Sequence, residues 1–221
     1  MNCLICDTIF QVKQSLLDLI LLVKAKDIIC HNCQLAFERI KQPNCSRCHK
    51  AHTEGICLDC QNWEKKDHFV SHRALYSYNE KMRDYFSSYK FQGDYVLRQV
   101  FAEEINKLIK KDYKDYTVIP VPLSDQREEE RGFNQVTAVL DCQSIPYQDI
   151  IVKKESQRQS HKGKKERERS QNPFCLKKDC QIPQKILIID DIYTTGTTLW
   201  HIVKLFKETK CEEIKTFSIA R

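Results

Sequence analysis

The sequence predicts an α/β protein, in which a mostly parallel sheet flanked by helices follows a small metal-binding domain. Three observations support this prediction. Strand-like and helix-like segments alternate over residues 67–221, a largely apolar stretch at residues 185–189 is typical of a strand buried on both faces, and the first 60 residues contain four Cys-x-x-Cys pairs. We therefore expect a metal-dependent domain at residues 1–66 and an α/β domain at residues 67–221.

Composition and charge are those of an ordinary globular protein, with 41% hydrophobic and 30% charged residues and a net charge of +6. The longest apolar run, residues 16–23, includes Asp18 and is shorter than the roughly 18–20 apolar residues that a bilayer span needs. We expect no transmembrane segment. The first residues also lack the basic and apolar regions of a secretion signal, so we expect a cytoplasmic protein.

The cysteine pairs predict zinc. Two cysteines separated by two residues can bind the same ion, and structural zinc takes four such ligands, so four pairs predict two ions. The simplest arrangement joins the Cys-x-x-Cys pairs in sequential order, the first with the second and the third with the fourth, and a cross-braced arrangement remains open. The sequential ligands are Cys3, Cys6, Cys30 and Cys33 for one ion and Cys45, Cys48, Cys57 and Cys60 for the other. Sites closed by four protein ligands leave no open position for catalysis, which indicates a structural role.

The first half of the α/β domain is expected to contain one strand and two helices. The strand lies at residues 74–78, and Asn79 can cap a helix that runs to about Lys90. Asp94 is expected to cap the second helix. Apolar residues with helical spacing predict its buried stripe: Val96, Leu97, Val100, Phe101, Ile105, Leu108 and Ile109.

The second half continues the alternation. A strand at residues 117–122 should stop where proline removes the hydrogen-bond donor, and we expect a loop after it that carries Arg127 and Arg131. A helix is expected to begin near Asn134. The remaining predicted elements are strands at residues 150–152, 185–189 and 214–219 and a helix at residues 198–208.

The strongest chemical signal is the stretch ILIIDDIYTTGTTL at residues 186–199. An acid pair ends a buried strand, and a Thr/Gly loop leads into a helix, which is where α/β sheets bind ligands. Backbone N–H groups and the helix start suit a phosphate, and Gly196 permits close backbone approach. Paired carboxylates can accept hydrogen bonds from ribose hydroxyls and attract Mg²⁺. The predicted ligand-binding residues are Asp190, Asp191, Thr194, Thr195, Gly196, Thr197 and Thr198.

Other interpretations of this stretch are weaker. An acidic turn with a helix cap needs only one such residue, whereas here seven converge. A nucleotide-binding P-loop is excluded because Gly-Lys-Ser/Thr is missing, and a dinucleotide site because the glycine triplet is missing.

The loop resembles the phosphoribosyl pyrophosphate (PRPP) motif of type I phosphoribosyltransferases. With the Cys-x-x-Cys pairs, KFQGD at 90–94, PVPL at 120–123, and Arg127 followed by RGFNQ at 131–135, the chain resembles the ComF family, and within it the ComFC-type late-competence proteins. The resemblance implies a type I phosphoribosyltransferase-like fold with an N-terminal double zinc ribbon. It also implies a cytoplasmic accessory of natural transformation, acting at the inner face of the membrane, that helps single-stranded DNA cross with a ComFA-type translocase ATPase.

The sequence assigns no catalytic residue and leaves enzymatic activity open. Lys90, Arg127, Arg131 and Arg158 could face pyrophosphate or DNA, although a solvated surface charge is as good an interpretation for each. The sequence displays no pocket for an acceptor base. Three functions remain: a DNA-uptake accessory with a PRPP-type site, which we favour, a salvage phosphoribosyltransferase, and a zinc-ribbon adaptor with a vestigial enzyme domain.

Single-stranded DNA has a predicted binding region in the basic segment, defined as residues 153–169, which holds eight Lys and Arg against three Glu. Contacts from such a segment to phosphates would be independent of base sequence. A solvated loop is the alternative interpretation. Aromatic residues near Lys81, Arg83 and Lys90 could stack on bases, but their helical spacing favours the core: Tyr85, Phe86, Tyr89, Phe91 and Tyr95.

Overall fold

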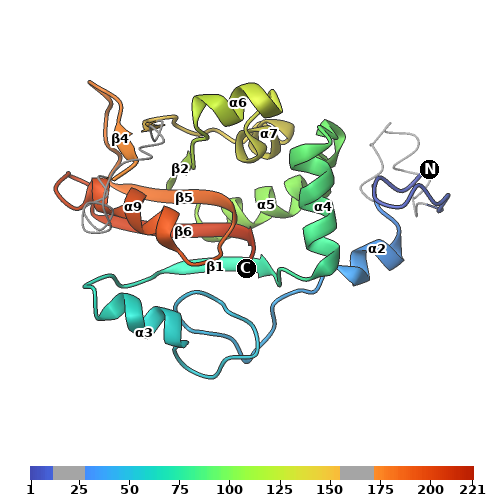
Figure 1. Ribbon diagram of the computed structural model, residues 1–221, viewed down its shortest axis with the longest axis horizontal. Helices are drawn as coiled ribbons and strands as arrows, with labels where there is room; N and C mark the ends of the chain where they lie inside the picture. The colour runs from blue at the N-terminus through green and yellow to red at the C-terminus, as the bar shows by residue number, and fades with distance from the viewer. Residues whose placement is uncertain (12–27, 155–171) are drawn as a thin grey trace, which may run out of the picture.

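The computed structural model describes residues 1–11, 28–154 and 172–221, and Figure 1 shows a central sheet with helices around it. The sheet has four strands in the order β1-β6-β5-β2, and each neighbouring pair is parallel. The strands are β1 (His72–Tyr76), β2 (Thr117–Pro120), β5 (Lys185–Ile192) and β6 (Glu213–Ala220). The predicted α/β class with a mostly parallel sheet is confirmed.

Strand β5 lies inside the sheet and is buried on both faces. Ile186, Leu187, Ile188 and Ile189 are each at most 2% exposed. Leu187 and Ile189 pack in one hydrophobic cluster, and Ile186 and Ile188 in the other, as expected because successive side chains of a strand alternate between faces. The strand runs beyond the predicted residue 189, so Asp190 is part of its ladder with β6.

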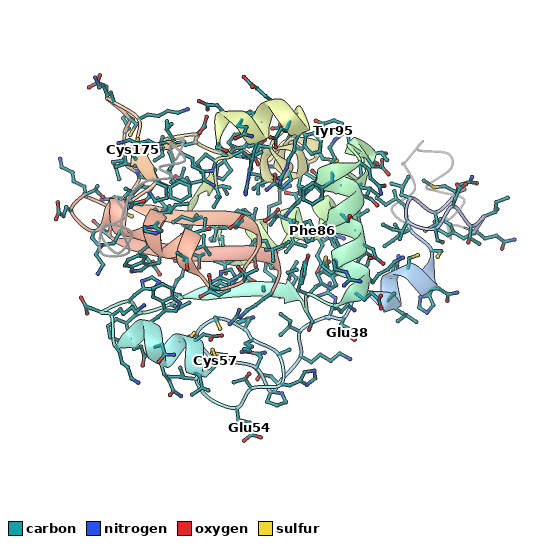
Figure 2. The ribbon with its side chains drawn as sticks, viewed as in Figure 1. Glu38, Glu54, Cys57, Phe86, Tyr95 and Cys175 are labelled. Atoms are coloured by element: carbon teal, nitrogen blue, oxygen red, sulfur yellow. The ribbon has the colours of Figure 1, made fainter. Side chains whose placement is uncertain are left out.

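Helices α4 (Glu80–Phe91), α5 (Gln99–Asp112) and α7 (Gln135–Cys142) contribute the residues that pack with Leu187 and Ile189. Asn79 caps α4 as predicted, because its side chain accepts a hydrogen bond from the Met82 N–H at 3.0 Å. Figure 2 shows Phe86 on the side of α4 that faces the sheet. The second helix begins differently from the prediction: Asp94 makes no side-chain cap, and a 3-10 helix, η1 (Tyr95–Arg98), precedes α5.

The opposite face is covered by α9 (Thr197–Phe206) and by an antiparallel hairpin of β3 (Ile151–Lys153) and β4 (Phe174–Leu176). Strand β4 was not predicted, because its three residues are too few to show a period.

The prediction that Arg127 and Arg131 lie in a loop is wrong. These residues belong to α6 (Asp125–Arg131), which ends at Gly132 with φ of 75°. The helix buries none of its seven residues, so it has no apolar stripe that a sequence pattern could reveal.

The N-terminal part contains α2 (His31–Ala36) and α3 (Leu58–Glu64) and packs against the α/β part. Figure 1 shows α3 along the β1 edge of the sheet. Arg39 forms a β-bridge with Tyr76, and the His72 N–H donates to the Arg47 carbonyl at 2.9 Å. The boundary between residues 66 and 67 stays a prediction. Within the described ranges, no helix has both the length and the apolar character needed to cross a bilayer.

Candidate functional site

The acid pair lies at the carboxyl end of β5. Asp190 Oδ1 accepts a hydrogen bond from the Asp191 N–H at 2.9 Å, and Asp191 Oδ1 accepts one from the Ile192 N–H at 2.7 Å. Both residues are buried. Burial and the neighbouring Asp191 carboxylate raise the pKa of Asp190 well above its usual range. The pair is therefore a desolvated acid pair, in which the proton of Asp190 is held more tightly than usual, at the end of the sheet where parallel folds bind ligands.

Lys90 reaches this end from α4 and forms an ion pair with Asp191 Oδ2. The two side chains are only 13% and 9% exposed, and the Lys90 ammonium lies 4.7 Å from the centre of the Phe86 ring. Oδ2 is buried and accepts no regular hydrogen bond from the described residues, so the ammonium serves as its counter-ion. A diol or metal ion at this carboxylate would compete with Lys90 or share the oxygen with it.

Two further cations interact electrostatically with the acids. The pKa of Lys153 is lowered by burial and by the charges of Arg127 and Arg131, and the charge of Asp190 opposes that shift. Arg131 Nη1 donates to Gln135 Oε1 at 2.9 Å. The pKa of Arg131 is lowered by burial and raised by the charge of Asp191, so the electrostatic influence of the acid pair extends to this residue of α6, whereas Arg127 interacts with Arg131 and Lys153. Lys153 was predicted only as part of the basic segment, and Arg158 lies outside the described residues.

The phosphate loop, defined as residues 194–198, connects β5 to α9. Gly196 is buried, has φ of 82° and is the N-cap of α9. Thr194, Thr195 and Thr197 are exposed, and the hydroxyls of Thr195 and Thr197 lie 2.9 Å apart. The helix begins at Thr197, one residue before the predicted start. Its first-turn N–H groups have no carbonyl partner within the helix, and among the described residues the Thr197 N–H donates only to Thr195 Oγ1, at 3.4 Å. The loop therefore combines these amides with hydroxyls and the positive end of the helix.

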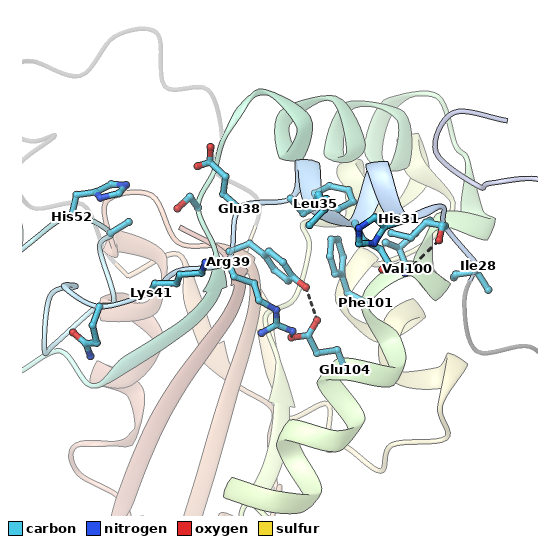
Figure 3. Close-up of a pocket in the computed structure, with 17 residues that line it drawn as sticks. Ile28, His31, Leu35, Glu38, Arg39, Lys41, His52, Val100, Phe101 and Glu104 are labelled. Carbon is cyan, nitrogen blue, oxygen red and sulfur yellow. Dashed lines mark hydrogen bonds and ion pairs between the residues drawn. The ribbon is translucent and has the colours of Figure 1, made fainter. Parts of the chain in front are cut away.

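A cavity of about 220 Å³ borders this loop, between Thr194 and Thr195 on one side and Trp63 and Lys66 on the other. A larger cavity, of about 730 Å³, lies elsewhere (Figure 3). It is lined by residues such as His31, Phe101 and Glu104, with no residue of the acid pair or the phosphate loop. Size alone therefore does not mark the predicted site.

The cysteines form two clusters with the sequential membership, and the cross-braced pairing does not occur. Within each cluster the ligand atoms all lie within 4.8 Å of one another. The Sγ–Sγ separations are 3.7 Å for Cys6 and Cys30 and 3.6 Å for Cys48 and Cys57. A tetrahedral ion with Zn–S bonds of about 2.3 Å requires separations of about 3.8 Å, so both clusters fit zinc. Figure 2 shows Cys57 beside α3.

Backbone amides support both clusters. The Cys30 N–H donates to Cys3 Sγ at 3.2 Å, and the Cys57 N–H donates to Cys45 Sγ at 3.3 Å. Such N–H donors stabilise thiolate charge and orient metal ligands. The clusters can thus hold two ions in a structural role, as the spacing predicted.

Comparison with known proteins identifies the family. Residues 100–221 match the phosphoribosyl transferase domain family. The chain is 42% identical to competence protein ComFC of Streptococcus pneumoniae over the full length of both chains. It is 31% identical to competence protein ComFC of Bacillus subtilis, over 99% of this chain and 94% of the relative, and 27% identical to competence protein F of Haemophilus influenzae, over 89% and 92%. This chain therefore belongs to the ComF family and carries a phosphoribosyltransferase-like domain.

Proposed function

We propose that this protein is a cytoplasmic accessory of natural competence that binds PRPP or a related ribose 5-phosphate and helps single-stranded DNA cross the inner membrane. One observation carries the ligand proposal: a buried acid pair lies at the carboxyl end of β5, next to a Thr/Gly loop with exposed threonines at the start of α9. The competence role is supported by relatives that are named as competence proteins.

In this proposal each group has a chemical role. The amides and hydroxyls of the phosphate loop hold the 5′-phosphate, as helix starts do for anions. Asp190 and Asp191 accept hydrogen bonds from the ribose hydroxyls. Lys90, Arg131 and Lys153 carry the charge that would balance a pyrophosphate group. Asp190 and Asp191 would hold Mg²⁺, which would supply positive charge against the negative charge of a pyrophosphate group.

The three hypotheses about function predict different results in binding and turnover assays. A salvage phosphoribosyltransferase would release pyrophosphate when PRPP meets an acceptor base. An accessory protein would bind PRPP without releasing pyrophosphate, whichever base is supplied. An adaptor with a vestigial domain would bind its protein partner equally well after loss of both acidic side chains. We favour the accessory, with a ComFA-type translocase ATPase as its partner.

Titration calorimetry with PRPP and Mg²⁺ tests the ligand proposal directly. The wild type should bind, and Asp190→Asn combined with Asp191→Asn should lose at least about 100-fold in affinity, because each lost hydrogen bond from a ligand hydroxyl to a charged acceptor costs about 1.5–3 kcal/mol. Asp115→Asn is the matched control, since Asp115 is exposed and precedes β2 at the opposite end of the sheet. Equal affinity of the double variant and the wild type would contradict the proposal.

A further inference from the structure

Arg221, which follows β6, links the second cysteine cluster (Cys45, Cys48, Cys57 and Cys60) to the phosphate loop. Its Nε donates to Cys48 Sγ at 3.1 Å, and its Nη1 donates to the Thr194 carbonyl at 3.0 Å. The guanidinium lies 4.5 Å from the centre of the Tyr193 ring. One side chain thus contacts a metal-ligating sulfur and the backbone of the proposed ligand loop.

A second contact reaches the next residue of the same loop. The Trp63 indole N–H, from α3, donates to the Thr195 carbonyl at 2.9 Å. Trp63 also packs on Trp200 of α9, with ring centres 5.4 Å apart. Helix α3 begins directly after Cys57, so the position of Trp63 depends on the same cluster.

The charge of Arg221 explains why a metal centre matters here. Its side chain is only 5% exposed, and a buried guanidinium is costly unless negative groups surround it. Asp59 Oδ2 lies 3.6 Å from Nη2 and is itself half exposed. Four thiolates around Zn²⁺ carry a net negative charge, so a loaded cluster is a second counter-ion for this guanidinium.

The two carbonyl contacts also orient the amides of the loop. A trans peptide group is planar, and its C=O and N–H point in opposite directions. Anchoring the Thr194 carbonyl to Arg221 therefore turns the Thr195 N–H away from Arg221. Anchoring the Thr195 carbonyl to Trp63 does the same for the Gly196 N–H.

We propose that the second cysteine cluster, when it holds zinc, sets the geometry of the phosphate loop, with Arg221 and Trp63 as positioning residues. The zinc ribbon is then part of the ligand site as well as a folded module. This inference rests on the proposed PRPP site for its affinity readout, whereas the loop geometry can be measured without ligand. Among the described residues, no hydrogen bond or ion pair joins the first cluster (Cys3, Cys6, Cys30 and Cys33) to the loop, so it should have no such role.

The test uses the full chain with Arg221→Gln and Trp63→Phe. Three quantities are measured: zinc per chain, PRPP affinity by calorimetry, and amide hydrogen exchange of residues 194–198 without ligand. Arg221→Gln should keep two zinc ions, lose about tenfold or more in PRPP affinity and speed exchange of the loop, because a charge-assisted hydrogen bond is lost. Trp63→Phe keeps the aromatic ring and should lose about threefold to tenfold.

The matched control is Arg73→Gln, since Arg73 lies on the neighbouring strand β1 and pairs with Asp112 of α5. This variant should match the wild type in affinity and loop exchange. If Arg221→Gln and Trp63→Phe also match the wild type within about twofold, a change too small to reflect a lost hydrogen bond, the inference is overturned. A wild type that binds no PRPP contradicts the proposed function, and the loop exchange rates then decide the inference alone.

Two cysteine variants test the role of the metal. Cys48→Ser and Cys6→Ser each remove one ligand, from the second and the first cluster respectively. Each should lower the zinc content, but only Cys48→Ser should speed amide exchange of residues 194–198. Equal effects on the loop would overturn the inference. Should Arg221→Gln fail to fold, Trp63→Phe and the cysteine variants still decide it.

Discussion

Gly196 lies directly against the phenol of Tyr193, where a Cβ atom at residue 196 would come 2.2 Å from the Tyr193 hydroxyl oxygen. The Tyr193 ring packs on His72 at a centroid distance of 4.3 Å and under the Arg221 guanidinium, so it has little freedom to move. With φ of 82°, residue 196 also lies in the left-handed region that favours glycine. Both features fix glycine at the turn that exposes the loop amides.

Gly196→Ala should therefore lower the free energy of unfolding by more than the backbone penalty alone, and it should abolish PRPP binding. We expect a loss of about 1–2 kcal/mol from the left-handed backbone and roughly 2 kcal/mol more from the clash. Gly55→Ala is the control, because Gly55 has φ of 70° and open space around a Cβ. Urea unfolding compares the two. Equal destabilisation by both substitutions would show that contact with Tyr193 does not constrain the loop.

Asp190→Asn should stabilise the ligand-free protein and remove ligand binding. Burial raises the pKa of Asp190, so between the usual carboxyl range and the raised pKa the native state holds more protons than the unfolded state. Stability should then fall as pH rises through that window. Asparagine cannot ionise, so the variant should melt a few degrees higher at pH 7, and the difference from the wild type should vanish near pH 4. A lower melting temperature at pH 7 would contradict this.

Lys90→Met should leave the Asp191 carboxylate buried without its counter-ion. Breaking a buried ion pair by removing one partner costs about 3 kcal/mol or more. Lys90→Met combined with Asp191→Asn removes both charges and should regain most of that stability, as measured by urea unfolding. If the double variant is no more stable than Lys90→Met alone, the loss comes from the contact of the Lys90 ammonium with the Phe86 ring.

DNA binding through the basic segment should depend steeply on salt. Neutralising five cations should reduce the slope of log K against log salt by up to about 3–4. The five to replace by Gln are Lys162, Lys164, Lys165, Arg167 and Arg169. A control variant replaces exposed lysines around the end of α5, Lys110, Lys111 and Lys114. Fluorescence anisotropy with a single-stranded oligonucleotide measures both, and an unchanged slope would place the DNA elsewhere.

The elements with strong periodic or chemical patterns were predictable from sequence. Strand β5, the cap at Asn79 and the two cysteine clusters follow from local apolar runs, a capping residue and ligand spacing. Helix α6 escaped prediction because it buries nothing, and β4 because it is short. The phosphate loop was recognised because its residues are contiguous.

The sequence by itself determined the class of the fold and the stretch that carries the acid pair and the phosphate loop. It also determined which eight cysteines can bind metal, but it did not determine which Cys-x-x-Cys pairs share an ion. Only the tertiary structure decided that Lys90 pairs with Asp191 and that Trp63 and Arg221 hold the loop carbonyls. Trp63 and Thr195 are 132 positions apart, and Arg221 and Cys48 are 173 apart. Contacts of that kind leave no periodic trace along the chain, because they form only when packed elements bring distant side chains together.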